Sequence, residues 1–185
     1  MISTLSFRLP RSTPPGSYQG SAELGGKQVP ITVDVEPRRR LRFIPSKLVY
    51  RGESGTGFSD EVILLNLGNV DVEIPAQDTF CVFDSSGVAQ AFYRGLAEEN
   101  AAGRSRIDRV MDELAKSHGG LVRVTVSRGS GRLAVEEARE LGIDLNFSHR
   151  LSAGHTYRGT WQVAEASLEI EIELVGNAAG EETTP

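Results

Sequence analysis

Few residues in this sequence have the types and spacing that catalysis or metal binding requires. His118, His149 and His155 have no cysteine beside them and no helical i, i+4 histidine partner, so a zinc site is not expected. Residues 128–131, Arg-Gly-Ser-Gly, lack the Gly-Lys-Ser/Thr ending of a phosphate-binding loop. Residues 52–55, Gly-Glu-Ser-Gly, fall one position short of a nucleophile elbow. We therefore expect no catalytic residue, no cofactor and no metal.

The other reactive groups fit structural roles. The single cysteine, Cys81, excludes an intrachain disulfide, and its apolar run at 79–83 predicts a buried, inert thiol. Glu169, Glu171 and Glu173 alternate with aliphatic residues, which indicates the solvated outer face of a strand rather than paired catalytic carboxylates. The sequence thus predicts a protein that is not an enzyme.

Composition and charge narrow the choice of partner. The chain has 185 residues, of which 39% are hydrophobic and 6% aromatic, and its 20 Gly and 8 Pro favour a turn-rich β or mixed fold. A net charge of −5 disfavours nucleic acid as the main partner. No apolar stretch approaches the roughly 18 residues of a membrane span. We expect protein partners, no nucleic acid and no membrane insertion.

The first 16 residues lack the charged start and apolar core of a signal peptide. We expect a periplasmic or extracellular location if the chain belongs to a longer secreted protein, and a cytoplasmic location otherwise. The polar tail at 176–185 is expected to be disordered.

An internal repeat organises the chain. The segments at 17–35 and 156–174 share a tyrosine, a glycine two residues later and a closing strand of alternating apolar residues, and Tyr18 lies 139 positions before Tyr157. Each segment predicts a β-hairpin, and we expect the two hairpins to superpose. Tyr157 and Trp161 fall on one face and are predicted to lie in the core.

Two motifs carry a resemblance to known domains. The segment Pro15-Gly16-Ser17-Tyr18-Gln19-Gly20, followed by an alternating strand, resembles the last two strands of bacterial immunoglobulin-like repeats. The strand at 41–50 and the strand-turn-strand at 61–74, which predicts a second hairpin, are similar to the opening half of immunoglobulin-like and PapD-like domains. The resemblance implies a mainly β fold, an immunoglobulin-like antiparallel β-sandwich with an inserted helical segment.

The same patterns predict how the chain is divided. Residues 1–36 form a hairpin, which ends a preceding sandwich repeat or docks on the main one, because two strands alone are unstable. Residues 37–40 are a solvated basic linker, 41–175 the sandwich, about 87–142 its helical insertion, and 176–185 the tail.

Within the insertion, Ser105 and an acid three residues later predict a helix start. An apolar stripe at i, i+3, i+4 and i+7 follows, formed by Ile107, Val110, Met111 and Leu114. A strand is predicted at 121–126 and a second short helix at 136–141.

We expect the insertion to contact a protein partner, because arginine and aromatic residues gather there. A plug for an open end of the sandwich is the alternative. The candidate contact residues are Phe92, Tyr93, Arg104, Arg106, Ile107, Arg109 and Val110.

The expected function is that of a non-catalytic binding or structural module in a bacterial envelope or cell-surface assembly. A PapD-like periplasmic chaperone is the first alternative, although such a chaperone has a second sandwich after the first. An enzyme with an unrecognised site is the second.

Overall fold

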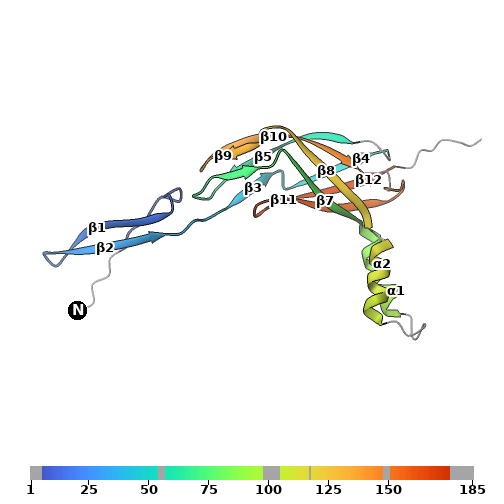
Figure 1. The fold of residues 1–185 in the computed structure, drawn as a ribbon, viewed down its shortest axis with the longest axis horizontal. Coiled ribbons are helices and arrows are strands. Elements are labelled where there is room, and N and C mark those ends of the chain that lie inside the picture. Colours follow the sequence, from blue (N-terminus) through green and yellow to red (C-terminus); the bar gives the residue numbers. More distant parts are fainter. Residues whose placement is uncertain (1–5, 54–56, 98–104, 117, 148–150, 176–185) are drawn as a thin grey trace, which may run out of the picture.

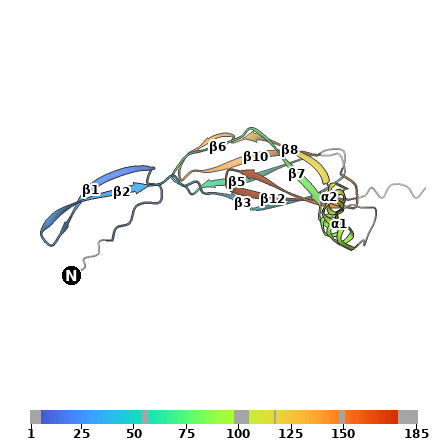
Figure 2. The ribbon, with the colours of Figure 1, turned by 60° about the horizontal axis from the view of Figure 1, so that its bottom comes forward.

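The computed structural model describes residues 6–53, 57–97, 105–116, 118–147 and 151–175. The described chain is mainly β, with two short helices. A hairpin extends from one end of a strand-rich main body, and the two helices project from the opposite end (Figure 1). Figure 2, which turns the molecule, shows the same order of hairpin, main body and helices.

The strands are β1 (Gly16–Leu24), β2 (Lys27–Val35), β3 (Leu41–Ile44), β4 (Lys47–Gly52), β5 (Phe58–Asn66), β6 (Val72–Ile74), β7 (Gln77–Asp84), β8 (His118–Arg128), β9 (Gly131–Leu133), β10 (Ala138–Phe147), β11 (Thr156–Val163) and β12 (Ala166–Leu174). The helices α1 (Ser85–Ala97) and α2 (Arg106–Lys116) lie between β7 and β8.

The main body is built on one eight-stranded sheet in the order β3-β5-β10-β8-β7-β11-β12-β4. All neighbouring pairs are antiparallel except β12 and β4, which are parallel. The strands at the two ends of this order, β3 and β4, follow each other in the chain across residues 45–46. The sheet therefore curls until it is nearly barrel-shaped, which confirms the mainly β prediction.

Alternating strand residues fill the interior. The ring centroids of Phe43 and Trp161 are 5.4 Å apart, and Trp161 is fully buried. Tyr157, two strand periods earlier on β11, is 5% exposed. The prediction that both residues belong to the core is confirmed. Leu64, Ile143, Leu168, Ile170 and Ile172 pack in the same cluster.

The two repeated segments form hairpins with the same register. Tyr18 pairs with Val33 in β1–β2, and Tyr157 pairs with Ile172 in β11–β12. The 139-residue separation of Tyr18 and Tyr157 holds for every pair from Ser17–Asp34 to Leu24–Lys27, so both segments form the predicted hairpins in one register.

The side chain of Asn69, which is buried, helps to hold the joint between β1–β2 and the main body, together with backbone hydrogen bonds from Asn69 to Arg38 and from Leu67 to Arg40. The Oδ1 atom of Asn69 accepts a hydrogen bond from the backbone N–H of Arg38 at 2.6 Å. Its Nδ2 donates to the carbonyls of Thr13 and Glu36, each at 3.0 Å. Thr13 precedes the hairpin and Glu36 follows it. Residues 37–40 are exposed, in keeping with the predicted solvated linker, but Arg38 is anchored to Asn69.

The second predicted hairpin, at 61–74, is wrong. β5 and β6 do form, but β6 pairs with β9 and not with β5. The side chain of Asn66 accepts from Gly68 N–H and donates to the carbonyl of Val70. Because these bonds and those of Asn69 shape the connection, the chain turns away from β5.

The predicted helix at 136–141 is also wrong, since these residues form a turn and the start of β10. Leu141, Ile143 and Leu145 are all buried, a period of two that places them on one face of a strand. The strand predicted at 121–126 lies within β8, between β7 and β10. The helical insertion is therefore confined to 85–116, and the rest of 87–142 belongs to the main body.

Replacing Trp161 tests the core. Trp161→Ala should lower the free energy of unfolding by about 3–5 kcal/mol, because it leaves a large cavity beside Phe43. Thr160→Ala, an exposed neighbour on the same strand, should change it by less than about 0.5 kcal/mol. Urea denaturation measures both, and equal losses would contradict the assignment of the two faces of β11.

Replacing Asn69 tests the joint. Asn69→Ala should cost about 1–3 kcal/mol, because it leaves partly buried backbone groups without these partners. Asn69→Asp keeps the acceptor for Arg38 but loses both donated bonds, so amide exchange at 36–40 should rise in that variant too. Unchanged exchange at 36–40 in Asn69→Ala would show that Asn69 does not hold the joint.

Candidate protein-interaction surface

The two helices form an arm at the end of β7. Asp84, the last residue of β7, begins α1: its Oδ1 accepts hydrogen bonds from the backbone N–H groups of Ser86 at 2.9 Å and Gly87 at 3.3 Å. This is the geometry of a helix N-cap. Ser105 caps α2, accepting from Asp108 N–H at 3.1 Å, which confirms the predicted start of that helix.

The helices of the arm cross closely because small residues line their contact. Ala91 is 1% exposed and Val110 is 8% exposed. A Cβ atom added to Gly95 would collide with Val110. The predicted contact residue Val110 thus points into the helix pair and away from solvent, which corrects its assignment to the exposed stripe.

The other predicted contact residues lie on the arm with different exposure. Tyr93 is 77% exposed, Ile107 74% and Phe92 50%. Arg106 is exposed and Arg109 half-buried, whereas Arg104 lies outside the described residues. The aromatic and aliphatic side chains of this set are accessible to a partner.

A groove at the base of the arm was not predicted from the sequence. It has a volume of about 610 Å³ and is lined by Phe83, Val88, Met111, Leu114 and Ala115. Phe83 comes from β7, and the others come from the two helices. We call it the basal groove. The predicted stripe contains two of its lining residues, Met111 and Leu114, but no pattern in the sequence indicated that Phe83 would meet them.

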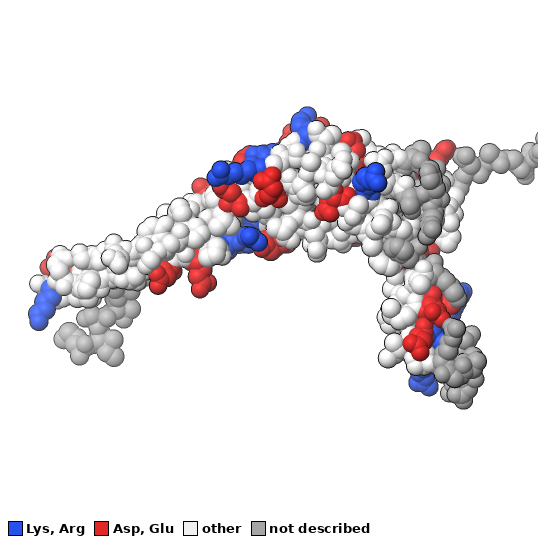
Figure 3. All heavy atoms as spheres, in the orientation of Figure 1, with Lys and Arg blue, Asp and Glu red and all other residues white. Residues whose placement is uncertain are grey.

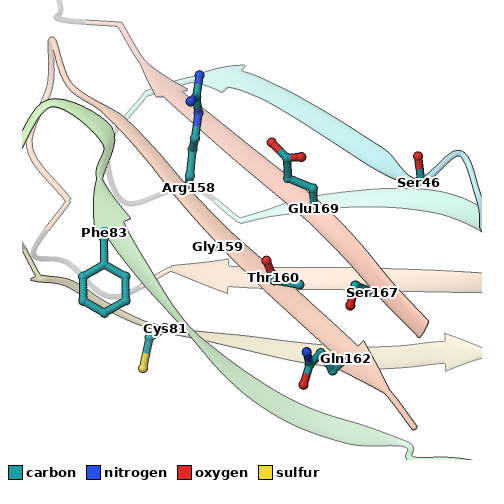
Figure 4. A pocket seen from close by; sticks show the side chains of 9 residues that line it. All are labelled: Ser46, Cys81, Phe83, Arg158, Gly159, Thr160, Gln162, Ser167 and Glu169. Carbon is teal, nitrogen blue, oxygen red and sulfur yellow. The ribbon is translucent and has the colours of Figure 1, made fainter. Parts of the chain in front are cut away.

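A second depression, of about 950 Å³, adjoins the basal groove. It crosses the outer faces of β7, β11 and β12, and we call it the sheet depression (Figure 4). Phe83 lines both hollows, so they lie next to each other. The sheet depression has both polar and apolar lining residues, namely Ser46, Cys81, Phe83, Arg158, Gly159, Thr160, Gln162, Ser167 and Glu169.

Cys81 is exposed in this depression, so the prediction of a buried thiol is wrong. In β7, Phe80 and Val82 point into the core, and Cys81 and Phe83 therefore point outward. The apolar run at 79–83 supplies both faces of the strand, which is why composition alone could not orient the thiol.

The carboxylates beside the sheet depression are engaged in ion pairs across strands. Glu171 accepts from Lys47 Nζ at 2.7 Å and from Arg158 Nε at 2.8 Å. The hydrogen bond from Lys47 holds the pKa of Glu171 below its usual value, against the effect of burial, and Arg158 adds to it. The predicted solvated row is therefore partly buried, and its charges join β12 to β4 and β11.

The described residues contain one histidine–carboxylate contact and no cluster of metal-binding side chains. His155 Nδ1 lies 2.6 Å from Asp84 Oδ2, at the base of the arm. Within the described ranges, no three His, Cys, Asp or Glu side chains gather as metal ligands would. His149 lies outside those ranges. No helix among the described residues is long and apolar enough to span a membrane.

Comparison with known proteins gives fold likenesses only. No family model matches the chain, and no curated protein matches it. Among solved structures, the PapD-like domain 7 of human CEP192 shares 13% identity at a TM-score of 0.33, over 95% of this chain and 96% of that one. A Porphyromonas gingivalis protein of unknown function shares 12% identity at a TM-score of 0.32, over 90% of this chain and 69% of that one.

A family 123 glycoside hydrolase from Clostridium perfringens, described for glycolipid glycan hydrolysis, shares 7% identity at a TM-score of 0.37. The match covers 70% of this chain but only 23% of the hydrolase, so this chain spans about a quarter of its length. At these TM-scores the likenesses carry no argument about function.

The cap of α1 predicts a pH-dependent contribution to stability. Burial works to raise the pKa of Asp84, but hydrogen bonds from Ser86, His155 and Gly87 outweigh it and lower that pKa below 3.8. A carboxyl with a lowered pKa stabilises the fold above its ordinary pKa and loses this effect as the pH falls through the lowered value.

Asp84→Ala should therefore cost about 1 kcal/mol at neutral pH, and the gap from wild type should close as the pH falls below 3.8. Asp84→Asn, which keeps a capping oxygen without the charge, is the matched control and should lose less. Chemical denaturation over the acid range measures this. A gap that widened in acid would contradict the assigned role of the charge.

Proposed function

We propose that this chain is a non-catalytic binding module that holds a protein partner in the angle between its arm and its sheet. The basal groove is the observation that carries the proposal. It brings Phe83 of β7 beside Val88 and Met111 of the arm, and Met111 is 59% exposed. Exposed apolar surface of this kind often marks a protein-binding site.

The proposed occupant is an amphipathic segment of another protein. Its apolar side chains would enter the basal groove, where the arm and Phe83 offer them apolar contact. Its polar side chains would face the sheet depression, where Arg158, Gln162 and Glu169 offer donors and acceptors. Phe83 lines both hollows, which favours one segment that contacts both.

We also propose that the eight strands are an immunoglobulin-like sandwich. The strand order divides into two groups of four, β3-β5-β10-β8 and β7-β11-β12-β4. The immunoglobulin fold has one sheet of four strands and one of three, so this chain would have one strand more. Tyr157 supports this reading, because its hydroxyl accepts from Ser152 N–H at 3.0 Å, five residues upstream. A tyrosine bonded to upstream backbone near the start of a strand is characteristic of such sandwiches.

The sandwich would act as a rigid mount for the arm. A bacterial envelope or cell-surface assembly is the setting we propose for it, in keeping with the resemblance of the hairpin motif to immunoglobulin-like repeats.

Charge placed in the basal groove tests the proposal. Met111→Asp should weaken capture of the partner from the native source by about tenfold or more, because the segment would have to desolvate a carboxylate. Val175→Asp is the matched control, since Val175 is also 59% exposed but lies outside the groove. Quantitative mass spectrometry of proteins retained by wild type and both variants is the measurement.

The expected result is a protein that is retained by wild type and Val175→Asp and lost from Met111→Asp. Retention of the same proteins by all three baits, with the Met111→Asp protein folded by circular dichroism, would contradict the proposal.

A further inference from the structure

The hairpin β1–β2 can be compared with β11–β12 residue by residue, because the two ladders share one register. Gly20 pairs with Ile31 in the first, and Gly159 pairs with Ile170 in the second. The tyrosine two residues before each glycine pairs in the same way. Each position of β1 therefore has a known counterpart in the main body.

Gly159, the counterpart of Gly20, must be a glycine because β7 approaches β11 closely at this position. β7 lies antiparallel to β11, with Val82 opposite Gly159. A Cβ atom at Gly159 would lie 2.6 Å from the carbonyl oxygen of Cys81 and 2.7 Å from the ring of Phe80. Any larger residue at this position would push β7 away from β11.

Gly20 has no such neighbour in the described structure, where nothing lies within 4 Å of a Cβ atom built on it. A glycine inside a strand costs roughly 0.5–1 kcal/mol relative to alanine. β1 thus has a destabilising glycine at the position that corresponds to Gly159 of β11. In β11 the close approach of β7 requires this glycine, whereas β1 has no such neighbour among the described residues.

The face of the hairpin that corresponds to the core side of β11–β12 is partly exposed, and Phe7 and Leu9, which precede the hairpin, lie beside it. A groove of about 360 Å³ runs over it, with Tyr18 and Ile31 among its lining residues. Tyr18 is 40% exposed, whereas its counterpart Tyr157 is 5% exposed. The visible side of the hairpin is mostly uncharged, with acidic groups along its lower edge toward the main body (Figure 3).

The two outer edges of the hairpin differ in what they can accept. On the β12 side, Glu169 N–H donates to the carbonyl of Ser46, beside β4, at 3.0 Å. The counterpart of Glu169 is Pro30, which has no N–H to donate. A proline of this kind is typical of an open strand edge. The outer edge of β1 is therefore the one suited to another strand.

We infer that the outer edge of β1 receives an antiparallel strand from a second unit of this same fold, with an aromatic side chain lying over Gly20 as Phe80 lies over Gly159. The second unit is the occupant that the repeat favours, because β7 is the strand that completes the matching hairpin in the main body. The Asn69 joint would hold this second unit at a fixed angle to the main body.

The experiment supplies the missing strand to the full chain. A second copy of residues 76–84, carrying Cys81→Ser in the copy, is joined to the N-terminus through a flexible Gly/Ser linker, which gives a millimolar effective concentration. Backbone amide exchange of β1 is compared with that of the untethered chain. We expect about tenfold slower exchange or more at 17–20.

Two variants of the tethered chain make the test specific. Gly20→Val should abolish the protection, because its side chain would fill the space that the added strand needs. Ser21→Val, the matched control on the opposite face of β1, should leave the protection in place. In the untethered chain, Gly20→Val should not lower the free energy of unfolding, since the space around Gly20 is open.

Two results would overturn the inference: no protection in the tethered chain, or protection that survives Gly20→Val. A dimer of the untethered chain that already protects 17–20 would support the inference and identify the second unit as another copy of this chain. None of these bears on the basal groove, so the proposed function is tested separately.

Discussion

The close approach of β7 to β11 is the contact on which the rest of the structure depends. β7 pairs with β8 on one side and β11 on the other, and so joins the two halves of the strand order. That pairing requires a glycine at 159, where the ring of Phe80 and the carbonyl of Cys81 leave no room for a side chain. Because β7 is paired on both sides, its position is fixed. The position of the element that follows β7 in the chain is fixed with it.

The arm begins there. Asp84 ends β7 and caps α1, so the direction of the strand sets the direction of the helix. The alternation of β7 also turns Phe83 outward to meet the arm, while Phe80 and Val82 enter the core. The basal groove therefore depends on one strand in two ways, through the helix that it starts and through the side chain that it presents.

Local patterns allowed much of this fold to be predicted from the sequence. The matched hairpins, the burial of Trp161 and the cap of α2 follow from period-two alternation and a serine placed three residues before an acid. The failures came where long-range contacts decide the outcome. Leu141 lies in β10, which becomes a strand by pairing with β5 and β8. The side chain of Asn69 forms a hydrogen bond with Arg38, some thirty residues earlier in the chain.

The candidate site was predictable only in part. Exposed residues such as Tyr93 and Ile107 were found from their type, whereas Val110 lies on the same helix but faces Gly95, a neighbour that only the fold supplies. The groove itself joins Phe83 to Met111, and no pattern within either segment indicates that they meet.

The central claim is that the partner lies in the basal groove, and site-specific photo-crosslinking tests it most directly. A benzophenone side chain is placed at residue 111 or, as the control, at residue 175, and each protein is irradiated in its native cells. The account predicts one protein joined to residue 111 and absent at residue 175, through a peptide whose apolar residues alternate with polar ones at helical or strand spacing. Crosslinks of equal yield to the same proteins from both positions would contradict it.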